Sequence, residues 1–349
     1  MKIITVTDAW APQVNGVVRT IEATNRELER AGHQTVVLSP DRFLTLPCPG
    51  YDGIRLAVAP QLRLGRMLAA EMAGGEEFAL HIATEGPLGR AARRWCRRGG
   101  VPFTTAYHTR FPQYMQAMYR VPEAWIYSVM RRFHNDASVV MAPTPTVAAE
   151  LREHGIRNVA LWTRGVDTDL FKPSPPLPLK LPQPIFLYVG RVSVEKNIAD
   201  FLIADLPGAK VVAGEGPALS TLKRRFPEAH FLGVLSQPEL AQLYSAADVF
   251  VFPSQTDTFG LVMLEALACG TPVAAYPVQG PVDVLGQADV GVLHEDLRMA
   301  AAAALKIDRR RCREFALARS WSVATREFVS LQRPVRMSRG GALAVSSGA

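Results

Sequence analysis

Short apolar runs alternate with amphipathic stretches through the first 142 residues. The run at 3–7 is apolar, and after a polar loop the apolar residues between Val17 and Ala31 recur with helical spacing. This order predicts a strand and a helix that ends at Gly32. The same reasoning predicts strands at 35–38, 78–82, 103–107 and 138–142, and helices at 87–98 and 123–133. Alternating strands and helices indicate a parallel sheet with both faces covered.

A proline-rich segment, residues 171–184, separates this series from a second one. Because proline cannot continue a helix or a central strand, the segment is predicted to be a linker. Beyond it, strands are predicted at 185–189, 210–213, 230–232, 249–252 and 272–275, and helices at 217–226, 238–246, 261–269 and 312–331.

The two series predict an α/β protein with two doubly wound, Rossmann-like domains. We expect an N-terminal domain at 1–170 and a C-terminal domain at 185–315. Residues 316–332 are expected to form a C-terminal helix that packs back on the first domain, and 333–349 a disordered tail. Two such domains facing each other make a central cleft, and ligands bind outside the carboxyl ends of the strands.

Composition narrows the class of protein. A length of 349 residues suits two domains, and 48% hydrophobic with 20% charged residues is typical of a soluble globular protein. The start, MKIITVTDAW, reads as a strand and not as a signal peptide, and no run of about 18 apolar residues follows. The cysteines are far apart in sequence, which argues against zinc and disulfides and suits the cytoplasm: Cys48, Cys96, Cys269 and Cys312.

The strongest chemical signal is the sequence DTFGLVMLE, from Asp257 to Glu265. It follows a predicted strand, and Gly260 is expected to open a helix whose free N–H groups can bind a phosphate or sugar oxygen. Glu265 would lie about one turn into that helix, where a carboxylate can accept two hydrogen bonds from a ribose diol. Asp257 would meet sugar hydroxyls. The plain alternative is that Asp257 caps the helix and Glu265 is a surface charge.

A second signal follows the strand at 185–189. Gly190 and Arg191 come directly after it, and Lys196 lies five residues further on. Two fixed cations at a strand end can stabilise the negative charge that grows on a departing diphosphate. The alternative is that both are ordinary solvated side chains.

Two weaker signals lie in the N-terminal half. Gly16, after Asn15, permits close approach of the backbone to a phosphate at a helix start, although an Asn-Gly turn is the simpler interpretation. His108 comes just past a predicted strand, where it can reach the transferred sugar or an acceptor hydroxyl, although a lone histidine is more often structural. We predict acceptor contacts from Asn15, His108 and Thr109.

Together the segments NGVVRT, YHT, GR with EKN, GEGP and TDTFGLVMLEALACGTPV resemble the retaining glycosyltransferases of family 4, which have the GT-B fold. The resemblance extends from Met1 to about Leu331. It is closest to the branch of diacylglycerol glycosyltransferases, sulfoquinovosyltransferases and α-mannosyltransferases, because of DAWAPQVNGVVRT and the TDTFG form.

The resemblance implies roles for particular residues. Arg191 and Lys196 match the pair that binds the donor diphosphate, and Glu265 matches the glutamate that holds the ribose. Asp257 matches a position that touches the donor sugar, where family members usually have the longer Glu. The remaining matches are Gly16 facing the diphosphate, His108 near the hydroxymethyl end of the sugar, and the amides of Phe259, Gly260 and Leu261 facing phosphate and sugar.

Two other motifs are judged to be decoys. Asp167 and Asp169 have the DxD form that binds metal in another glycosyltransferase fold, but here they lead into the linker. The sequence GEGPAL from Gly214 to Leu219 begins like a dinucleotide fingerprint but lacks its third glycine. We therefore expect neither a metal site nor NAD, and Mg²⁺ can assist without being essential.

The resemblance implies transfer of a hexosyl group with retention, and UDP-sugars are favoured over GDP-mannose as donor. No carboxylate must act as a covalent nucleophile, so we expect front-face transfer in which Arg191, Lys196, His108 and Asp257 are catalytic. A GT-B-fold sugar-nucleotide epimerase, and a degenerate member that only binds nucleotide or membrane, remain as alternatives.

Charge bears on the acceptor. The net charge is +7, and arginines crowd one predicted helix (Arg93, Arg94, Arg97 and Arg98) and join aromatic residues on another (Trp125, Arg131, Arg132 and Phe133). Such helices suit an anionic membrane, although a solvated arginine-rich helix is an equal alternative. We expect a lipid acceptor such as diacylglycerol, or else a saccharide, in a cytoplasmic protein attached to the inner face of the plasma membrane. No motif supports nucleic-acid binding.

Overall fold

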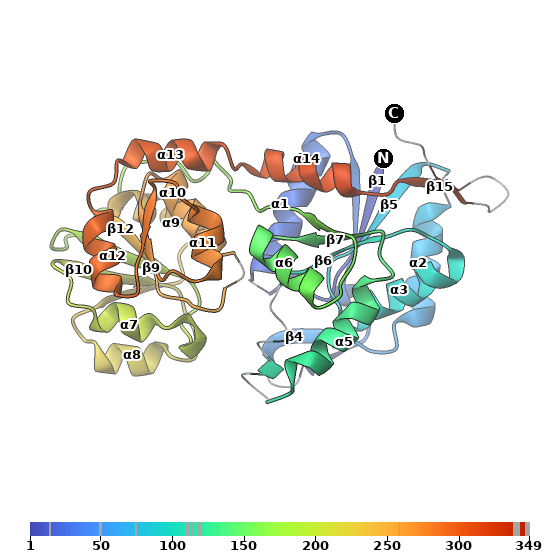
Figure 1. Cartoon of the computed structure of the whole chain (residues 1–349), viewed down its shortest axis with the longest axis horizontal. Helices are drawn as coiled ribbons and strands as arrows, with labels where there is room; N and C mark the ends of the chain where they lie inside the picture. The colour runs from blue at the N-terminus through green and yellow to red at the C-terminus, as the bar shows by residue number, and fades with distance from the viewer. Residues whose placement is uncertain are drawn as a thin grey trace. The chain divides into compact units, whose positions relative to one another are not determined.

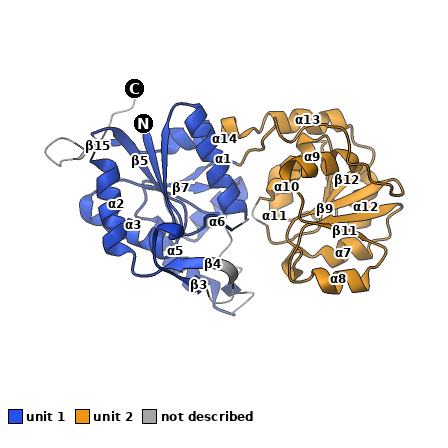
Figure 2. Ribbon diagram, turned by 180° about the vertical axis from the view of Figure 1, so that it is seen from behind, with its two compact units in different colours: residues 1–163, 324–349 blue, residues 164–323 orange. Residues whose placement is uncertain are grey.

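The chain divides into two units, and each unit encloses a parallel β-sheet. In this computed structural model, unit 1 comprises Met1–Thr163 and Ala324–Ala349, and unit 2 comprises Arg164–Val323 (Figure 2). The structure describes residues 1–13, 15–48, 51–73, 75–108, 112, 115–116, 120–257, 259–337 and 343–345. The predicted pair of doubly wound α/β domains is confirmed.

Six strands of unit 1 pair in parallel, in the order β2-β1-β5-β6-β7-β8. They are β1 (Lys2–Val6), β2 (Gln34–Leu38), β5 (Glu77–Ile82), β6 (Thr104–Ala106), β7 (Val139–Ala142) and β8 (Val159–Leu161). The helices of this unit are α1 (Gly16–Arg30), α2 (Gln61–Met72), α3 (Pro87–Gly99), α5 (Glu123–His134), α6 (Pro145–Glu153) and, from Ala324 onward, α14 (Trp321–Leu331) (Figure 1). A separate hairpin consists of β3 (Thr45–Cys48) and β4 (Tyr51–Ala57).

The sheet of unit 2 is entirely parallel, in the order β11-β10-β9-β12-β13-β14. Its strands are β9 (Ile185–Val189), β10 (Ala209–Ala213), β11 (His230–Gly233), β12 (Val249–Phe252), β13 (Val273–Ala275) and β14 (Gly291–Leu293). Its helices are α7 (Ile198–Ile203), α8 (Leu219–Arg225), α9 (Gln237–Ala246), α10 (Leu261–Ala268), α11 (Gln279–Leu285), α12 (Leu297–Ala304) and α13 (Arg309–Leu317).

In each sheet, the order in which successive strands are added reverses at one point, called the switch point. In unit 2 the chain builds outward from β9 to β11 and then returns to place β12 on the other side of β9. In unit 1, β5 returns in the same way to pair with β1. Loops diverge at the carboxyl ends of strands that flank such a switch point, so ligand sites are expected there.

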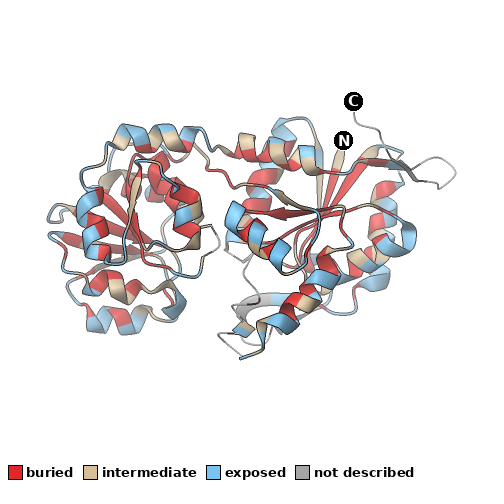
Figure 3. Cartoon of the chain, in the orientation of Figure 1, coloured by how far each residue is buried: buried red, intermediate tan, exposed pale blue. Residues whose placement is uncertain are grey.

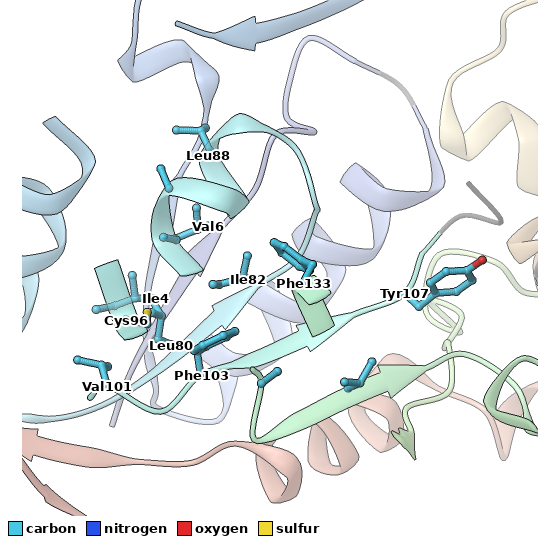
Figure 4. Packing of buried hydrophobic residues seen from close by; sticks show 14 of the residues in the cluster. Ile4, Val6, Leu80, Ile82, Leu88, Cys96, Val101, Phe103, Tyr107 and Phe133 are labelled. Atoms are coloured by element: carbon cyan, nitrogen blue, oxygen red, sulfur yellow. The ribbon is translucent and has the colours of Figure 1, made fainter. Parts of the chain in front are cut away.

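Strand alternation fills two cores in unit 1. Ile4 and Val6 of β1 join one apolar cluster, and Ile3 joins the cluster on the opposite face with Trp162 and Phe328. Figure 4 shows part of the first cluster, where side chains of β1, β5 and α3 pack together. In both units the buried residues follow the strands and the inner faces of the helices (Figure 3).

The strands and helices named from the sequence lie within two residues of the observed bounds at each end, with one exception. The single helix predicted at 312–331 is wrong, because the structure has two helices, α13 and α14. Between them the backbone pairs with residue 166: the N–H of Val166 donates to Arg319 O (3.0 Å), and the N–H of Trp321 donates to Val166 O (3.3 Å). Those groups are therefore not available to continue one helix.

Two other segments differ from expectation. The leucines of the predicted linker, Leu177, Leu179 and Leu181, pack on the core of unit 2. In the predicted disordered tail, β15 (Val335–Met337) pairs antiparallel with β5 and with β16 (Leu343–Val345), and Val335 is fully buried. Burial of Val335 at the sheet edge stabilises this strand. The polar sequence around Val335 does not indicate that burial.

Candidate active site

The loop after β9 carries both predicted cations of unit 2. Arg191 is exposed, and its carbonyl accepts a hydrogen bond of 2.9 Å from the buried hydroxyl of Tyr188. Lys196 follows at the end of a short 3₁₀ helix, η2 (Val194–Lys196). The strand end and the Tyr188 hydroxyl thus fix the backbone of this loop, while the Arg191 guanidinium stays accessible.

Lys196 and Asp257 form an ion pair across the switch point. Lys196 Nζ lies 2.5 Å from Asp257 Oδ1, and the two side chains are 23% and 24% exposed. Asp257 follows β12, which is the strand beside β9, so topology places both residues at the same edge of the sheet. Burial raises the pKa of Tyr188, and the negative charges of Asp257 and Glu195 raise it further, so this hydroxyl remains a hydrogen-bond donor.

The GEGP loop after β10, which begins at Gly214 and which we do not expect to bind NAD, packs against the loop of Arg191. A Cβ on Gly214 would lie 1.9 Å from Gly190 O, so a side chain at 214 would push the two loops apart. The N–H of Val192 donates to Glu215 O (2.8 Å), and the N–H of Ala218 donates to Val192 O (3.0 Å). The GEGP segment therefore determines where Arg191 lies, a role that no spacing rule predicted.

Helix α10 begins as predicted at Leu261, after Gly260. Gly260 has a φ of +84°, and a Cβ there would meet the ring of Phe252 at 2.9 Å. Phe259 and Leu261 on either side are half-buried, and Phe259 packs on the core of unit 2. Glycine at 260 is thus required both by the left-handed backbone and by the close approach.

Glu265 is not the surface charge of the plain alternative. It is 7% exposed in a helix that is otherwise apolar, and its Oε2 accepts a 3.0 Å hydrogen bond from the Tyr244 hydroxyl of α9. A buried carboxylate needs such a donor, because burial of an ionised group without a hydrogen bond is costly. Tyr244 was missed, because an isolated tyrosine on a helix carries no sequence signal.

In unit 1, Asn15 caps the helix that Gly16 begins. Asn15 Oδ1 accepts hydrogen bonds of 3.0 Å from the N–H groups of Val17 and Val18, and its Nδ2 donates to Gln13 Oε1 (3.1 Å). Gly16 is exposed, and a Cβ built on it meets no atom of the described residues within 4 Å. The N–H groups of Val17 and Val18 are already bound by the Asn15 side chain, so the phosphate contact at Gly16 stays a prediction.

His108 lies two residues beyond β6, at the carboxyl edge of the sheet of unit 1. It is half-buried, and its ring makes an edge contact with Trp162 at 6.0 Å between centroids. Thr109, the third predicted acceptor residue, lies outside the described residues.

Two acidic contacts at the same edge, one buried and one half-buried, were not predicted. Asp8, after β1, accepts hydrogen bonds from the N–H of Leu88 (2.8 Å) and from the Thr84 hydroxyl (2.9 Å), and burial raises its pKa. Glu85, after β5, lies 3.1 Å from Nε2 of the fully buried His134. Asp8 and Glu85 lie in the loops after β1 and β5, and a polar residue in the loop after a strand was also the signal used to predict Arg191.

The structure also describes the Asp167–Asp169 motif and can be searched for metal sites and membrane-spanning helices. Asp167 Oδ1 accepts hydrogen bonds from the backbone N–H groups of Asp169 (3.2 Å) and Leu170 (3.1 Å), which is a turn-capping role. Among the described residues, no three His, Cys, Asp or Glu side chains gather as a metal site would require. In the part of the chain that the structure describes, no helix combines the length and apolarity needed to cross a bilayer.

Comparison with known proteins agrees with this arrangement. The model for glycosyltransferase family 4 matches residues 14–170, and that for glycosyl transferases group 1 matches residues 172–310. A GDP-mannose-dependent alpha-mannosyltransferase of Mycobacterium tuberculosis is 31% identical, over 96% of this chain and 97% of the relative. An alpha-monoglucosyldiacylglycerol synthase of Streptococcus pneumoniae is 27% identical, over 79% of this chain and 71% of the relative.

The fold is shared with solved glycosyltransferases. The sucrose-phosphate synthase of Thermosynechococcus elongatus superposes with a TM-score of 0.75 at 22% identity, over 95% of this chain and 98% of that one. The predicted GT-B fold is thereby confirmed. Two family models that together span most of the chain, and a relative aligned over nearly all of it, lead to one conclusion: the chain belongs to glycosyltransferase family 4, a family of retaining enzymes that use nucleotide-sugars.

Proposed function

We propose that this enzyme transfers mannose from GDP-mannose to a hydroxyl of a membrane lipid, with retention of the anomeric configuration. The observation that carries the proposal is the Lys196–Asp257 pair at the switch point of unit 2, beside the exposed Arg191. The sequence alone favoured a UDP-sugar. The relative aligned over 96% of the chain is named for GDP-mannose, which makes GDP-mannose the first donor to test.

In this proposal, donor binding replaces the Lys196–Asp257 ion pair with an ion pair between Lys196 and the donor diphosphate. Arg191 and the Lys196 ammonium bind the diphosphate, which frees Asp257 for the hydroxyls of the mannose. Glu265 accepts hydrogen bonds from the ribose diol, and its bond from Tyr244 holds the carboxylate in place. The amides of 259–261 face phosphate and sugar oxygens.

The proposed chemistry needs no covalent enzyme intermediate. The bond from C1 of the mannose to the phosphate oxygen breaks, and negative charge grows on the diphosphate beside Arg191 and Lys196. The acceptor oxygen then bonds to C1 on the same face, and its proton passes to the phosphate oxygen that leaves. His108, Asn15 and Thr109 orient the acceptor, so catalysis rests on positioning and charge stabilisation.

Two observations favour a lipid acceptor: the name of one relative and the exposed apolar residues of α5. The synthase from Streptococcus pneumoniae is named for monoglucosyldiacylglycerol. On α5, Trp125 is 75% exposed and Val129 53% exposed, one helical turn apart on the same face. An exposed tryptophan beside an apolar residue suits the interface of a bilayer, and the chain attaches there peripherally from the cytoplasm.

The test is a donor screen with a defined readout. The purified chain is incubated with GDP-mannose, UDP-glucose or UDP-glucuronic acid and a membrane lipid extract, and products are identified by mass spectrometry. We expect a mannolipid with GDP-mannose, an α-linkage by NMR, and little product from Lys196→Ala. A chain that isomerises a nucleotide-sugar without acceptor and makes no glycoside would instead be an epimerase.

A further inference from the structure

A concave patch on unit 1 collects arginines from three segments of the chain. Arg93 and Arg97 come from α3, Arg131 and Arg132 from α5, and Arg157 from the loop after α6. Asp136 is the one acidic residue in the lining. We infer that this pocket binds the phosphate group of a second ligand, distinct from the nucleotide-sugar donor.

The pocket is held in place by contacts of its own. Arg93 and Arg97 both contact Asp136 Oδ2, at 2.5 Å and 3.3 Å. Asn135 accepts a 2.8 Å hydrogen bond from the N–H of Arg157 and donates to Gly155 O (3.0 Å), which ties the loop after α6 to the end of α5. Three separate segments are thus connected so that their guanidinium groups converge.

The positive charge is not balanced within the protein. Asp136 is shared by two arginines, and no ion pair of the described residues involves Arg131, Arg132 or Arg157. In addition, Arg93 Nε is buried and has no hydrogen-bond partner among the described residues. A buried donor without a partner carries a desolvation cost that a bound anion would remove.

The usual preference for basic residues in the last turn of a helix does not account for all arginines of the pocket. Basic residues are common in the last turn of a helix, where they face free carbonyl groups. That explains Arg97, Arg131 and Arg132 by position. It does not explain Arg93, which lies before the last turn, or Arg157, which lies in a loop.

The pocket lies at the edge of the sheet opposite the proposed acceptor residues. Helices α3, α5 and α6 end just before β6, β7 and β8 begin, so their C-terminal ends lie at the amino edge of this parallel sheet. His108 follows the carboxyl end of β6. At about 3.3 Å per residue, β6 alone separates the two edges by about 10 Å, so the pocket is a separate site.

Phosphate matches this lining better than a carboxylate does. A phosphate monoester carries close to two negative charges and three terminal oxygens, each able to accept from a guanidinium fork. Five arginines around one point offer more donors than a carboxylate can use. The shared chemistry is a phosphate monoester, which a soluble metabolite or the headgroup of an anionic lipid can supply.

The test compares two double variants that remove equal charge. Arg131→Gln with Arg157→Gln alters the pocket, and Arg94→Gln with Arg98→Gln alters exposed arginines of α3 outside its lining. Each full-length protein is titrated with glycerol 3-phosphate by calorimetry. Each is also co-sedimented with phosphatidylcholine vesicles with and without phosphatidic acid. Thermal unfolding checks that both variants fold, and GDP affinity, which should not change, checks the donor site independently.

We expect the wild type and the Arg94/Arg98 variant to bind with Kd values within about twofold, and the Arg131/Arg157 variant to bind at least about tenfold more weakly. Binding of glycerol 3-phosphate identifies a soluble source, and binding of phosphatidic acid vesicles alone identifies a lipid source. Equal weakening in both variants would mean diffuse charge and overturn the inference. So would a folded wild type that binds neither probe.

Discussion

At the scale of single residues, the Lys196–Asp257 pair combines low structural importance with direct relevance to the proposed chemistry. Both side chains are partly exposed, at 23% and 24%, and ion pairs of this kind contribute about 0–1 kcal/mol to stability. When a donor phosphate takes the place of Asp257 as the partner of Lys196, the cost in free energy is therefore small. Glu265 is the opposite case, because it is buried and its hydrogen bond from Tyr244 fixes it in place.

Replacing Lys196 by alanine should lower kcat at least about tenfold, because a fixed charge facing the departing diphosphate is typically worth a few kcal/mol in the transition state. The free energy of unfolding should change by less than about 1 kcal/mol. Steady-state kinetics and urea denaturation measure the two effects. Lys180→Ala, an exposed lysine of the proline-rich segment, is the control. Turnover near that of the wild type would remove Lys196 from the mechanism.

At the scale of elements, loops at strand ends are held by their neighbours and not by their own sequence. The loop after β9 rests on the GEGP loop after β10, and the start of α1 rests on the Asn15 cap. Both arrangements determine where a catalytic or binding group lies.

Gly214→Ala should destabilise unit 2 by about 1–3 kcal/mol and reduce donor affinity, because the new Cβ would lie 1.9 Å from Gly190 O and displace the loop of Arg191. Gly286→Ala is the matched control, since Gly286 also has a positive φ (+57°) but a Cβ there meets no described residue within 4 Å. Denaturant unfolding and GDP titration of both variants make the comparison. A Gly214 variant no worse than the Gly286 variant would contradict the close packing.

Asn15→Ala should cost about 1 kcal/mol of stability, because two N–H groups of α1 lose their acceptor. Asn15→Ser should restore most of that stability, since serine is also a good N-cap. If Asn15 in addition contacts the acceptor, the serine variant keeps its stability but shows a raised KM for the acceptor. An alanine variant as stable as the wild type would exclude the capping role.

At the scale of the whole molecule, unit 1 is built from both ends of the chain. Residues from Ala324 onward return to it, where Trp162 Nε1 donates to Ala324 O (3.1 Å) and Phe328 packs against the Trp162 ring at 4.9 Å between centroids. The C-terminal helix is therefore part of the core of the N-terminal unit.

Phe328→Ala should destabilise unit 1 by about 3–5 kcal/mol, because it leaves a cavity beside Trp162 and Ile3. Arg326→Ala, on the exposed face of the same helix, should change stability by less than about 0.5 kcal/mol. Hydrogen exchange of the amides of β1 and β5 reports on unit 1 directly. Unchanged protection in the Phe328 variant would show that the helix is not needed for that core.

Local patterns in the sequence were enough for the strands and helices named from it, since strands such as Ile185–Val189 and Val249–Phe252 are continuous apolar runs. The break between α13 and α14 was not predictable, because it depends on pairing with Val166, about 150 residues away in the chain. For the candidate site, the position of a polar residue after a strand predicted Arg191 and His108. Partners such as Tyr244 depend on tertiary packing, which periodicity does not encode.

The central claim is that unit 2 binds a nucleoside diphosphate through Arg191 and Lys196. Calorimetric titration of the full chain with GDP and with UDP tests it most directly. We predict one binding site for at least one of the two nucleotides, and at least about a hundredfold loss of affinity in Arg191→Ala with Lys196→Ala, since two charge-assisted contacts disappear. Equal affinity in that double variant, or a folded wild type that binds neither nucleotide, would contradict the account.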